Sequence, residues 1–219
     1  MLWSALTMLS LGFQRRPVAQ GPMRRVPEFQ FEWIDRSHPN RGSIELFIAT
    51  VFARRYGAQV RYFSDVIIGS RDEEDRWIAA VGFSALSHHS AYLENYLDQP
   101  VEYLIAASVR GGQLFRRVSR WDIVEVGNLA AIRAGAARAL ILHMTRYLYR
   151  RHFQWVVLTA TKELSNSFSR LGYQPTVITA ADPNRLEGCG KSWGTYYESH
   201  PEVVFVDIGA SYAHIAAAN

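Results

Sequence analysis

The sequence predicts an α/β fold, a mixed sheet with helices packed on it, from three observations. Residues 122–130 form an apolar, strand-like run, residues 137–148 repeat apolar side chains at helical spacing, and residues 155–159 are almost continuously apolar. A continuous apolar pattern is typical of a strand that is covered on both faces in a parallel pairing. Because the helix lies between the two strands, we predict a crossover connection in which strands 122–130 and 155–159 run parallel.

The elements before residue 122 are predicted from periodicity and turn residues. Apolar side chains recur at helical spacing from residue 44 to 52, after a cap at Ser43, and Gly57 stands where this helix is expected to stop. The other predicted elements are the two strands of a hairpin at 60–70 and 76–86, a helix-like stretch at 91–97 and a segment without clear ends at 101–109.

The elements after residue 130 alternate between helix and strand. The helix at 137–148 ends in Arg150 and Arg151, where cations suit the negative end of the helix dipole. A short helix at 164–171 is expected to stop at Gly172. Two further strands are predicted at 176–179 and 202–208, separated by a loop that contains several aromatic residues.

Length and composition predict one folded domain over residues 29–219. The chain has 219 residues, and single domains usually contain roughly 100–200. Residues 1–28 hold several prolines and little periodicity, so we expect a flexible N-terminal arm there. Apolar side chains within residues 2–13 share one helical face, which leaves a peripheral membrane anchor as an alternative for this arm.

Charge and cysteine content exclude several classes of partner. There are 24 basic against 20 acidic residues, an excess too small to indicate nucleic-acid binding, and no clustered basic stripe supports it. Cys189 is the only cysteine, so the chain forms no internal disulfide and no cysteine metal cluster, and we predict no metal site. No run reaches the roughly 18 apolar residues of a membrane-spanning helix. We therefore expect a cytoplasmic protein.

Glu125 is the residue that most needs an explanation, because it is an acid within an apolar strand. An ionised carboxylate in such surroundings is costly unless it has a partner or changes its pKa. Alternate side chains of a strand share a face, so Glu125 and Gly127 point the same way, and the glycine leaves space for a ligand. The alternative to a catalytic role is a buried ion pair of Glu125 with Arg120 or Arg138.

Several sequence blocks resemble the bacterial thermostable hemolysin family. They cover roughly residues 43 to 208 in order, and comprise Leu93–Glu102, Ile123–Ala130, Trp155–Thr161, Phe168–Tyr173 and Trp193–Tyr197. That family is similar in layout to the Gcn5-related N-acyltransferases and the acyl-homoserine lactone synthases. The resemblance implies a mixed sheet with helices on both faces, splayed open between its two central parallel strands, 122–130 and 155–159. The pantetheine arm of a thioester is expected in the gap.

The resemblance also implies an acyltransferase. The expected reaction moves an acyl group, including a fatty acyl group, from a coenzyme A or acyl-carrier-protein thioester to a small-molecule amine. The thioester is a co-substrate, and no tightly bound cofactor is expected. A partly desolvated Glu125 with a raised pKa suits a general base that takes the proton of the amine. Backbone N–H groups near Gly127, Asn128 and Leu129 are expected to polarise the thioester carbonyl.

Two further groups of residues are candidates for binding. Arg133, Gly135 and Arg138 stand where the related enzymes bind the pyrophosphate of coenzyme A at a helix N-terminus, although this loop has fewer glycines, which leaves room for a carrier-protein donor. The alternative is close helix packing through small residues. Trp193, Tyr196 and Tyr197 are predicted to line an acyl tunnel or substrate mouth, and aromatic core packing is the alternative. Thr159 is a further candidate for substrate binding.

Glu94 is a second catalytic candidate, because it belongs to an acidic series with Asp98 and Glu102. An acid/base or amine-binding role competes there with a solvated helix face. Phe168 stands where many related enzymes carry a tyrosine that protonates the leaving thiolate, so Tyr173, Tyr196 or water is expected to replace it. Two other functions stay open at this point: a membrane-active hemolysin, and a thioester- or lipid-binding module without catalysis.

Overall fold

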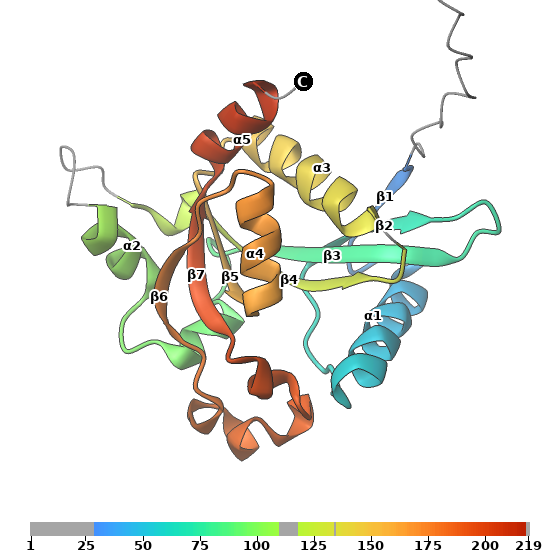
Figure 1. The fold of residues 1–219 in the computed structure, drawn as a ribbon, viewed down its shortest axis with the longest axis horizontal. Helices are drawn as coiled ribbons and strands as arrows, with labels where there is room; N and C mark the ends of the chain where they lie inside the picture. Colours follow the sequence, from blue (N-terminus) through green and yellow to red (C-terminus); the bar gives the residue numbers. More distant parts are fainter. Residues whose placement is uncertain (1–28, 110–117, 134, 218–219) are drawn as a thin grey trace, which may run out of the picture.

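The computed structural model describes residues 29–109, 118–133 and 135–217, and its centre is a seven-stranded mixed sheet (Figure 1). The strand order is β1-β2-β3-β4-β5-β7-β6. All neighbouring strands are antiparallel except β4 and β5, which are parallel. The strands are β1 (Phe31–Ile34), β2 (Val66–Arg71), β3 (Trp77–Ala85), β4 (Ile123–Ala131), β5 (Trp155–Ala160), β6 (Thr176–Ala180) and β7 (Glu202–Asp207).

The central parallel pair separates after only three residues. Ile123, Val124 and Glu125 of β4 pair with consecutive residues of β5. Beyond Glu125, β4 continues along β3 to Ala131, while β5 continues along β7 to Ala160. The connection between them is the helix α3 (Ala136–Arg150). The predicted crossover, the parallel pairing and the splayed sheet are therefore confirmed.

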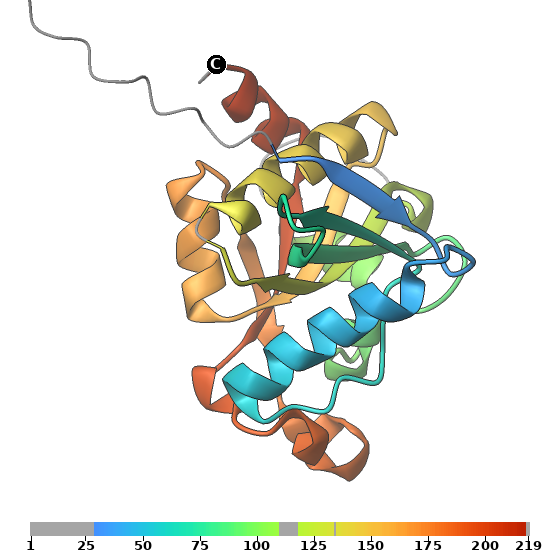
Figure 2. The ribbon, with the colours of Figure 1, turned by 90° about the vertical axis from the view of Figure 1, so that its right-hand side faces the viewer.

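Helices cover both faces of the sheet. On one face, α3, α4 (Lys162–Arg170) and α5 (Ile208–Ala217) pack against strands β2 to β7 in the largest hydrophobic core. On the opposite face, α1 (Arg41–Tyr56) covers the β1–β3 half, and Figure 2 shows α1 and α3 on opposite sides of the strands. The short 3₁₀ helix η1 (Tyr92–Tyr96) and α2 (Val101–Val109) cover β5 and β7 on that same face. This second face thus has two separate cores, and β4 runs between them.

Short 3₁₀ helices complete the described chain. They are η2 (Arg120–Asp122), η3 (Pro183–Arg185), η4 (Glu187–Trp193) and η5 (Tyr196–Ser199). The last three belong to the aromatic loop between β6 and β7. Backbone hydrogen bonds tie this loop to the end of α1, because Thr195 N donates to Tyr56 O at 2.8 Å and Gln59 N to Ser192 O at 2.6 Å.

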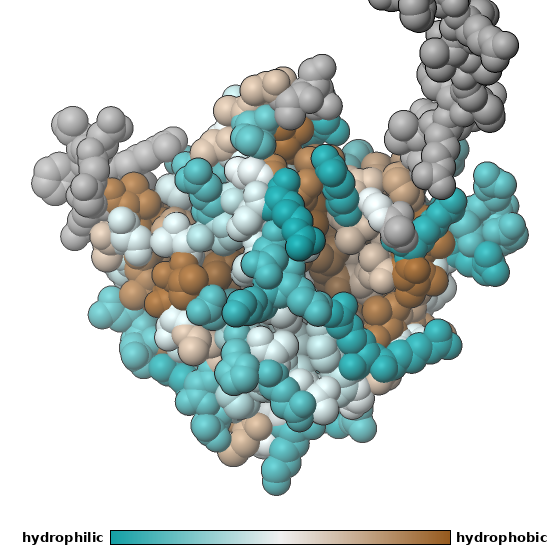
Figure 3. Space-filling view, in the orientation of Figure 1, coloured by the Kyte–Doolittle hydropathy of each residue, from teal (hydrophilic) through white to brown (hydrophobic). Residues whose placement is uncertain are grey.

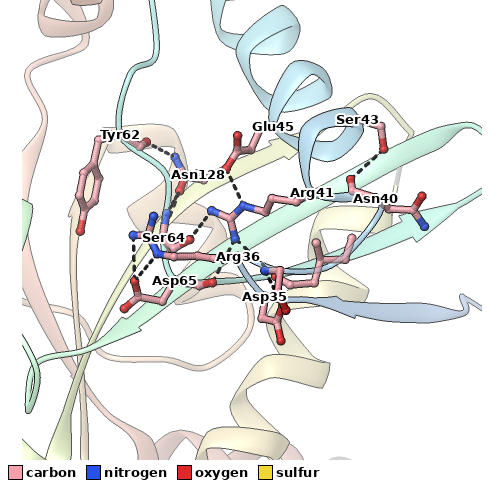
Figure 4. Close-up of polar contacts among 12 residues, drawn as sticks. Asp35, Arg36, Asn40, Arg41, Ser43, Glu45, Tyr62, Ser64, Asp65 and Asn128 are labelled. Carbon is pink, nitrogen blue, oxygen red and sulfur yellow. Dashed lines mark hydrogen bonds and ion pairs between the residues drawn. The ribbon is translucent and has the colours of Figure 1, made fainter.

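The predicted C-terminal end of α1 is confirmed, and its predicted start is wrong. Gly57 ends the helix in a left-handed conformation with φ of 67°, as expected. The start is wrong, because α1 begins at Arg41, with Asn40 as its N-cap residue. Ser43 already lies in the helix, where its hydroxyl donates to Asn40 O at 2.9 Å instead of accepting a backbone N–H (Figure 4). Gly172 likewise follows the end of α4 with φ of 79°, as predicted.

Two elements were not predicted, and one strand is shorter than expected. β1 and α5 are absent from the prediction, and β2 begins at Val66 rather than at residue 60. Alternation of Phe29, Phe31 and Trp33 is the local signal that indicates β1. The predicted arm, residues 1–28, lies outside the described residues. Among the described helices, none has the length and apolar composition needed to cross a membrane.

Candidate active site

A cavity of about 330 Å³ opens where β4 leaves β5, and both faces of the sheet contribute to it. On the side of α3 and α4 the lining is largely apolar, although Glu163 and Ser167 of α4 also belong to it. We call the aliphatic part of this lining the aliphatic wall, and it consists of Val126, Ile141, Met144, Leu158 and Leu164. Figure 3 shows hydrophobic residues in the gap between α3 and α4. The opposite face contributes seven rings, which we call the aromatic wall: Phe52, Tyr56, Tyr62, Tyr92, Tyr96, Trp193 and Tyr196.

Glu125 lies at the point where the two central strands separate, and its carboxyl group is held by backbone N–H groups. The residue is 8% exposed. Its Oε2 accepts from Tyr92 N at 2.8 Å, and its Oε1 accepts from Leu93 N at 2.9 Å. Burial raises the pKa of Glu125 to about 7, although these two hydrogen bonds favour the ionised form. Near neutral pH, Glu125 therefore exchanges a proton readily.

The predicted alternative for Glu125, an ion pair with a buried arginine, is wrong. Within the described part of the chain Glu125 has no ion pair with Arg120 or Arg138. Arg120 binds Glu94 and Glu102 instead, and Arg138 is exposed. Among the described residues, only backbone N–H groups stabilise the charged carboxylate, and burial outweighs them, which is why its pKa is high.

Glu94 is partly buried in an ion pair and does not line the cavity. Its two oxygens accept from the Arg120 guanidinium at 2.7 and 2.9 Å. Ala91 N and Val101 N also donate to it, at 3.0 and 3.1 Å. Burial acts to raise the pKa of Glu94, but Arg120 and the backbone donors outweigh it and lower the pKa. Glu102 shares the same guanidinium at 2.7 Å, so these two acids do not form the solvated face weighed as the alternative.

A β-bulge turns the backbone of β4 toward the cavity. Between the pairs Gly82–Gly127 and Ala80–Ala130, Val81 of β3 opposes two residues of β4, Asn128 and Leu129. Asn128 has φ of 53°, in the left-handed region that asparagine tolerates better than most residues. A bulge leaves backbone groups outside the ladder. Gly127, Asn128 and Leu129 all line the cavity. These are the residues whose backbone N–H groups are predicted to contact the thioester carbonyl.

The side chain of Asn128 fixes this bulge to the chain segment that precedes β2. Its Oδ1 accepts from Ser64 N at 2.9 Å, and its Nδ2 donates to Tyr62 O at 3.1 Å (Figure 4). The buried Arg41 of α1 donates to Ser64 O at 2.6 Å and to Asp65 O at 3.0 Å. These contacts hold the backbone of residues 62–65 and so position Tyr62 in the aromatic wall.

The candidate phosphate-binding residues lie outside the cavity. Gly135 and Arg138 are exposed and flank Ala137, which does line it. Arg133 lines a separate, open depression at the β1–β2 edge, together with Glu32, Asp72, Glu73 and Asp75. Gly135 begins α3 in a left-handed conformation with φ of 81°. Binding of the coenzyme A pyrophosphate by Arg133, Gly135 and Arg138 stays a prediction. It concerns the part of the thioester donor that would extend out of the cavity.

The predicted substrate-binding residues come together at the cavity. Thr159, Trp193 and Tyr196 all line it, whereas Tyr197 packs against the core of β5 and β7 instead. Trp193 Nε1 donates to the Tyr92 hydroxyl at 3.1 Å, and the Tyr196 hydroxyl donates to Thr159 O at 3.5 Å. The sequence did not identify the other aromatic residues of the wall. The four-residue spacing of Phe52 and Tyr56 on the amphipathic α1 is the signal that places two of them on one helix face.

The candidate proton donors for the leaving thiolate differ in whether they line the cavity. Phe168 lines the cavity, as its position in the motif predicts. Tyr173 does not line it, because its ring stacks on Phe168 and its hydroxyl bonds to the Thr145 hydroxyl at 2.8 Å. Tyr196 does line the cavity. In the described residues there is no group of three or more histidine, cysteine, aspartate or glutamate side chains that could hold a metal ion.

The splayed pair of parallel strands, the bulge and the crossover helix define a Gcn5-related N-acyltransferase-like fold of the kind found in acyl-homoserine lactone synthases. The acyl-homoserine lactone synthase LasI has a similar structure, with a TM-score of 0.56 and 13% identity over 85% of this chain and 95% of that one. TofI, in a ternary complex with an inhibitor and MTA, has a TM-score of 0.54 and 15% identity over 85% of this chain and 96% of that one.

A third structure is BjaI, a CoA-dependent acyl-homoserine lactone synthase with SAM and isopentyl-CoA, with a TM-score of 0.53 and 14% identity over 87% of this chain and 89% of that one. No curated protein sequence matches the chain. The model of the thermostable hemolysin family matches residues 34–212. The chain therefore belongs to the thermostable hemolysin family.

Proposed function

We propose that the protein transfers an acyl group, including a fatty acyl group, from a coenzyme A or acyl-carrier-protein thioester to an amine. The observation that carries this proposal is Glu125, a buried carboxyl group with a pKa of about 7 at the split between β4 and β5. A general base works best when its pKa lies near the operating pH. The fold shared with the acyl-homoserine lactone synthases supports the same reaction class.

The thioester fits the cavity with its carbonyl at the bulge and its acyl chain along the aliphatic wall. The wall offers only apolar side chains, and burying an aliphatic chain there contributes about 0.8 kcal/mol per methylene group. The backbone at Gly127 to Leu129 supplies N–H groups for the oxygen that becomes negative as the carbonyl is attacked. The bulge is thus the element that stabilises the transition state.

Glu125 acts on the amine. It removes the proton that the amine nitrogen must lose as the new carbon–nitrogen bond forms and the carbon–sulfur bond breaks. Burial raises the pKa of the Tyr196 hydroxyl, so this group is a neutral O–H at physiological pH. Of the two tyrosines that the motif left as proton donors, Tyr196 lines the cavity and Tyr173 does not, so Tyr196 gives a proton to the leaving thiolate. Glu94 has no part in this chemistry, because Arg120 holds it ionised outside the cavity.

The test measures the two products together. Acyl-coenzyme A and acyl-carrier-protein donors with acyl chains from acetyl to dodecanoyl are incubated with the full-length protein and a panel of primary amines. We expect free thiol to appear together with the matching amide, detected by mass, and only when an amine is present. Thiol release without an amide would indicate a thioesterase. No turnover with any donor and amine would contradict acyl transfer.

A further inference from the structure

The aromatic wall is a continuous set of rings that begins beside Glu125. Tyr92, whose backbone N–H binds the Glu125 carboxyl group, stacks on Tyr62 with ring centroids 5.3 Å apart. Tyr92 also contacts Trp193 at 6.1 Å, and Trp193 contacts Tyr196 at 5.4 Å. Tyr56 extends the series with an edge contact to Tyr196 at 5.3 Å. An acceptor bound against this wall meets π surfaces over its whole length.

The charges around the cavity favour a cation. Glu125 is the acid at its centre, and Arg55 is the only cationic side chain among its described lining residues. Arg55 is half exposed and forms an ion pair with Glu163, which also lines the cavity. A carboxylate on the acceptor would therefore find no unpaired cation in this lining and would add a second negative charge near Glu125.

Building on the acyl-transfer function proposed above, we infer that the acceptor is a primary arylalkylamine without a carboxylate. Its ammonium group is attracted by the faces of tyrosine and tryptophan rings and by Glu125, and its aromatic body packs against the aromatic wall. The aliphatic wall on the other side of the sheet is left for the acyl chain. An amino acid of the same shape carries a carboxylate that these surroundings disfavour.

The reaction with such an acceptor is balanced by groups already described. The ammonium first loses one proton to solvent. The amine nitrogen then attacks the thioester carbon, and Glu125 takes the second proton as the carbon–nitrogen bond forms. The carbon–sulfur bond breaks, the Tyr196 hydroxyl gives its proton to the thiolate, and the proton held by Glu125 returns through solvent to Tyr196. The products are an N-acyl arylalkylamine, the free thiol and one proton released to solvent. No oxidant, reductant or metal takes part.

Matched pairs of acceptors test this inference. Tryptamine is compared with tryptophan, tyramine with tyrosine, and phenethylamine with phenylalanine, using one acyl-coenzyme A donor. We expect kcat/KM to be at least roughly tenfold higher for each amine than for its amino acid. Equal or better use of the amino acids would overturn the inference and leave acyl transfer standing, whereas the absence of any thiol release would contradict the proposed function itself.

A variant of the wall tests the role of the rings. Trp193→Leu should raise KM for tryptamine at least roughly fivefold and leave KM for the acyl donor within twofold, because it removes one ring from the acceptor side only. Trp121→Leu is the matched control, since Trp121 is 70% exposed and does not line the cavity. The ratio of hexylamine turnover to phenethylamine turnover independently measures how much the aromatic ring of the acceptor contributes. Unchanged KM in Trp193→Leu, or equal use of hexylamine by the natural protein, would overturn the aromatic recognition.

Discussion

Glu125, which is buried, and Glu94, which is partly buried, both accept backbone N–H groups from the same short turn, and their pKa values shift in opposite directions. Tyr92 and Leu93 donate to Glu125, while Ala91 donates to Glu94. Two differences separate them: Glu125 is the more deeply buried, and Arg120 binds both oxygens of Glu94. Arg120 also has a raised pKa, because Glu94 accepts its hydrogen bonds. Burial therefore outweighs the two backbone donors at Glu125, whereas Arg120 and the backbone donors together outweigh the smaller burial of Glu94.

This difference assigns separate tasks to the two acids. Glu94, with Arg120, ties the turn at residues 91–94 to the start of α2, since Val101 N also donates to it. Backbone N–H groups of this turn then hold Glu125 in place at the cavity. One acid stabilises the structure, and the other is left available for proton transfer. The same substitution at the two positions should therefore affect different quantities.

Glu125→Gln should have the largest effect, a loss of roughly 10²–10⁴-fold in acyl transfer, because a positioned base typically contributes that much. The amide oxygen can still accept one backbone N–H, but the amide nitrogen would face the other as a second donor. We therefore expect a stability cost of about 1–3 kcal/mol as well. Rates must be corrected for the folded fraction, measured by thermal unfolding. A variant with full turnover would show that Glu125 is not the base.

The second effect is the pH dependence of kcat/KM. A base with a pKa of about 7 is active only when it is deprotonated, so kcat/KM calculated on the concentration of neutral amine should rise with pH and level off above 7. Below that value, kcat/KM should fall roughly tenfold per pH unit, to about one hundredth at pH 5. The pH profile is measured with the natural protein and with Glu94→Gln as a control. A profile that is flat between pH 5 and 7 would rule out Glu125 as the titrating group.

Glu94→Gln should act mainly on stability, with a loss of about 1–3 kcal/mol in the free energy of unfolding. Arg120 keeps Glu102 as a partner, so the loss stays below that of a fully stranded buried charge. Turnover per folded molecule should change little. Asp98→Asn is the matched control, because Asp98 is exposed, and we expect a change below about 0.5 kcal/mol. Denaturant unfolding of both variants measures the difference. Similar losses in the two would contradict the structural role of Glu94.

The sequence by itself determined the order of elements around the site. Continuous apolar strands and the helix between them were enough to predict the parallel pair β4 and β5, because local periodicity and the handed crossover rule limit the topology. Gly57 and Gly172 ended their helices as predicted, since a left-handed residue is a local requirement. Glu125 stood out because the cost of an acid in an apolar strand follows from the residue alone.

The tertiary structure decided what the local patterns leave open. The donors to Glu125 come from residues more than thirty positions earlier, and the choice of Arg120 for Glu94 over Glu125 depends on how η1 and η2 pack. The aromatic wall joins α1, η1 and the loop after β6, which approach one another only when the sheet forms. A pKa depends on the distances and burial of all these groups at once. For that reason, the sequence pointed to Glu125, and only the folded chain set its charge and its neighbours.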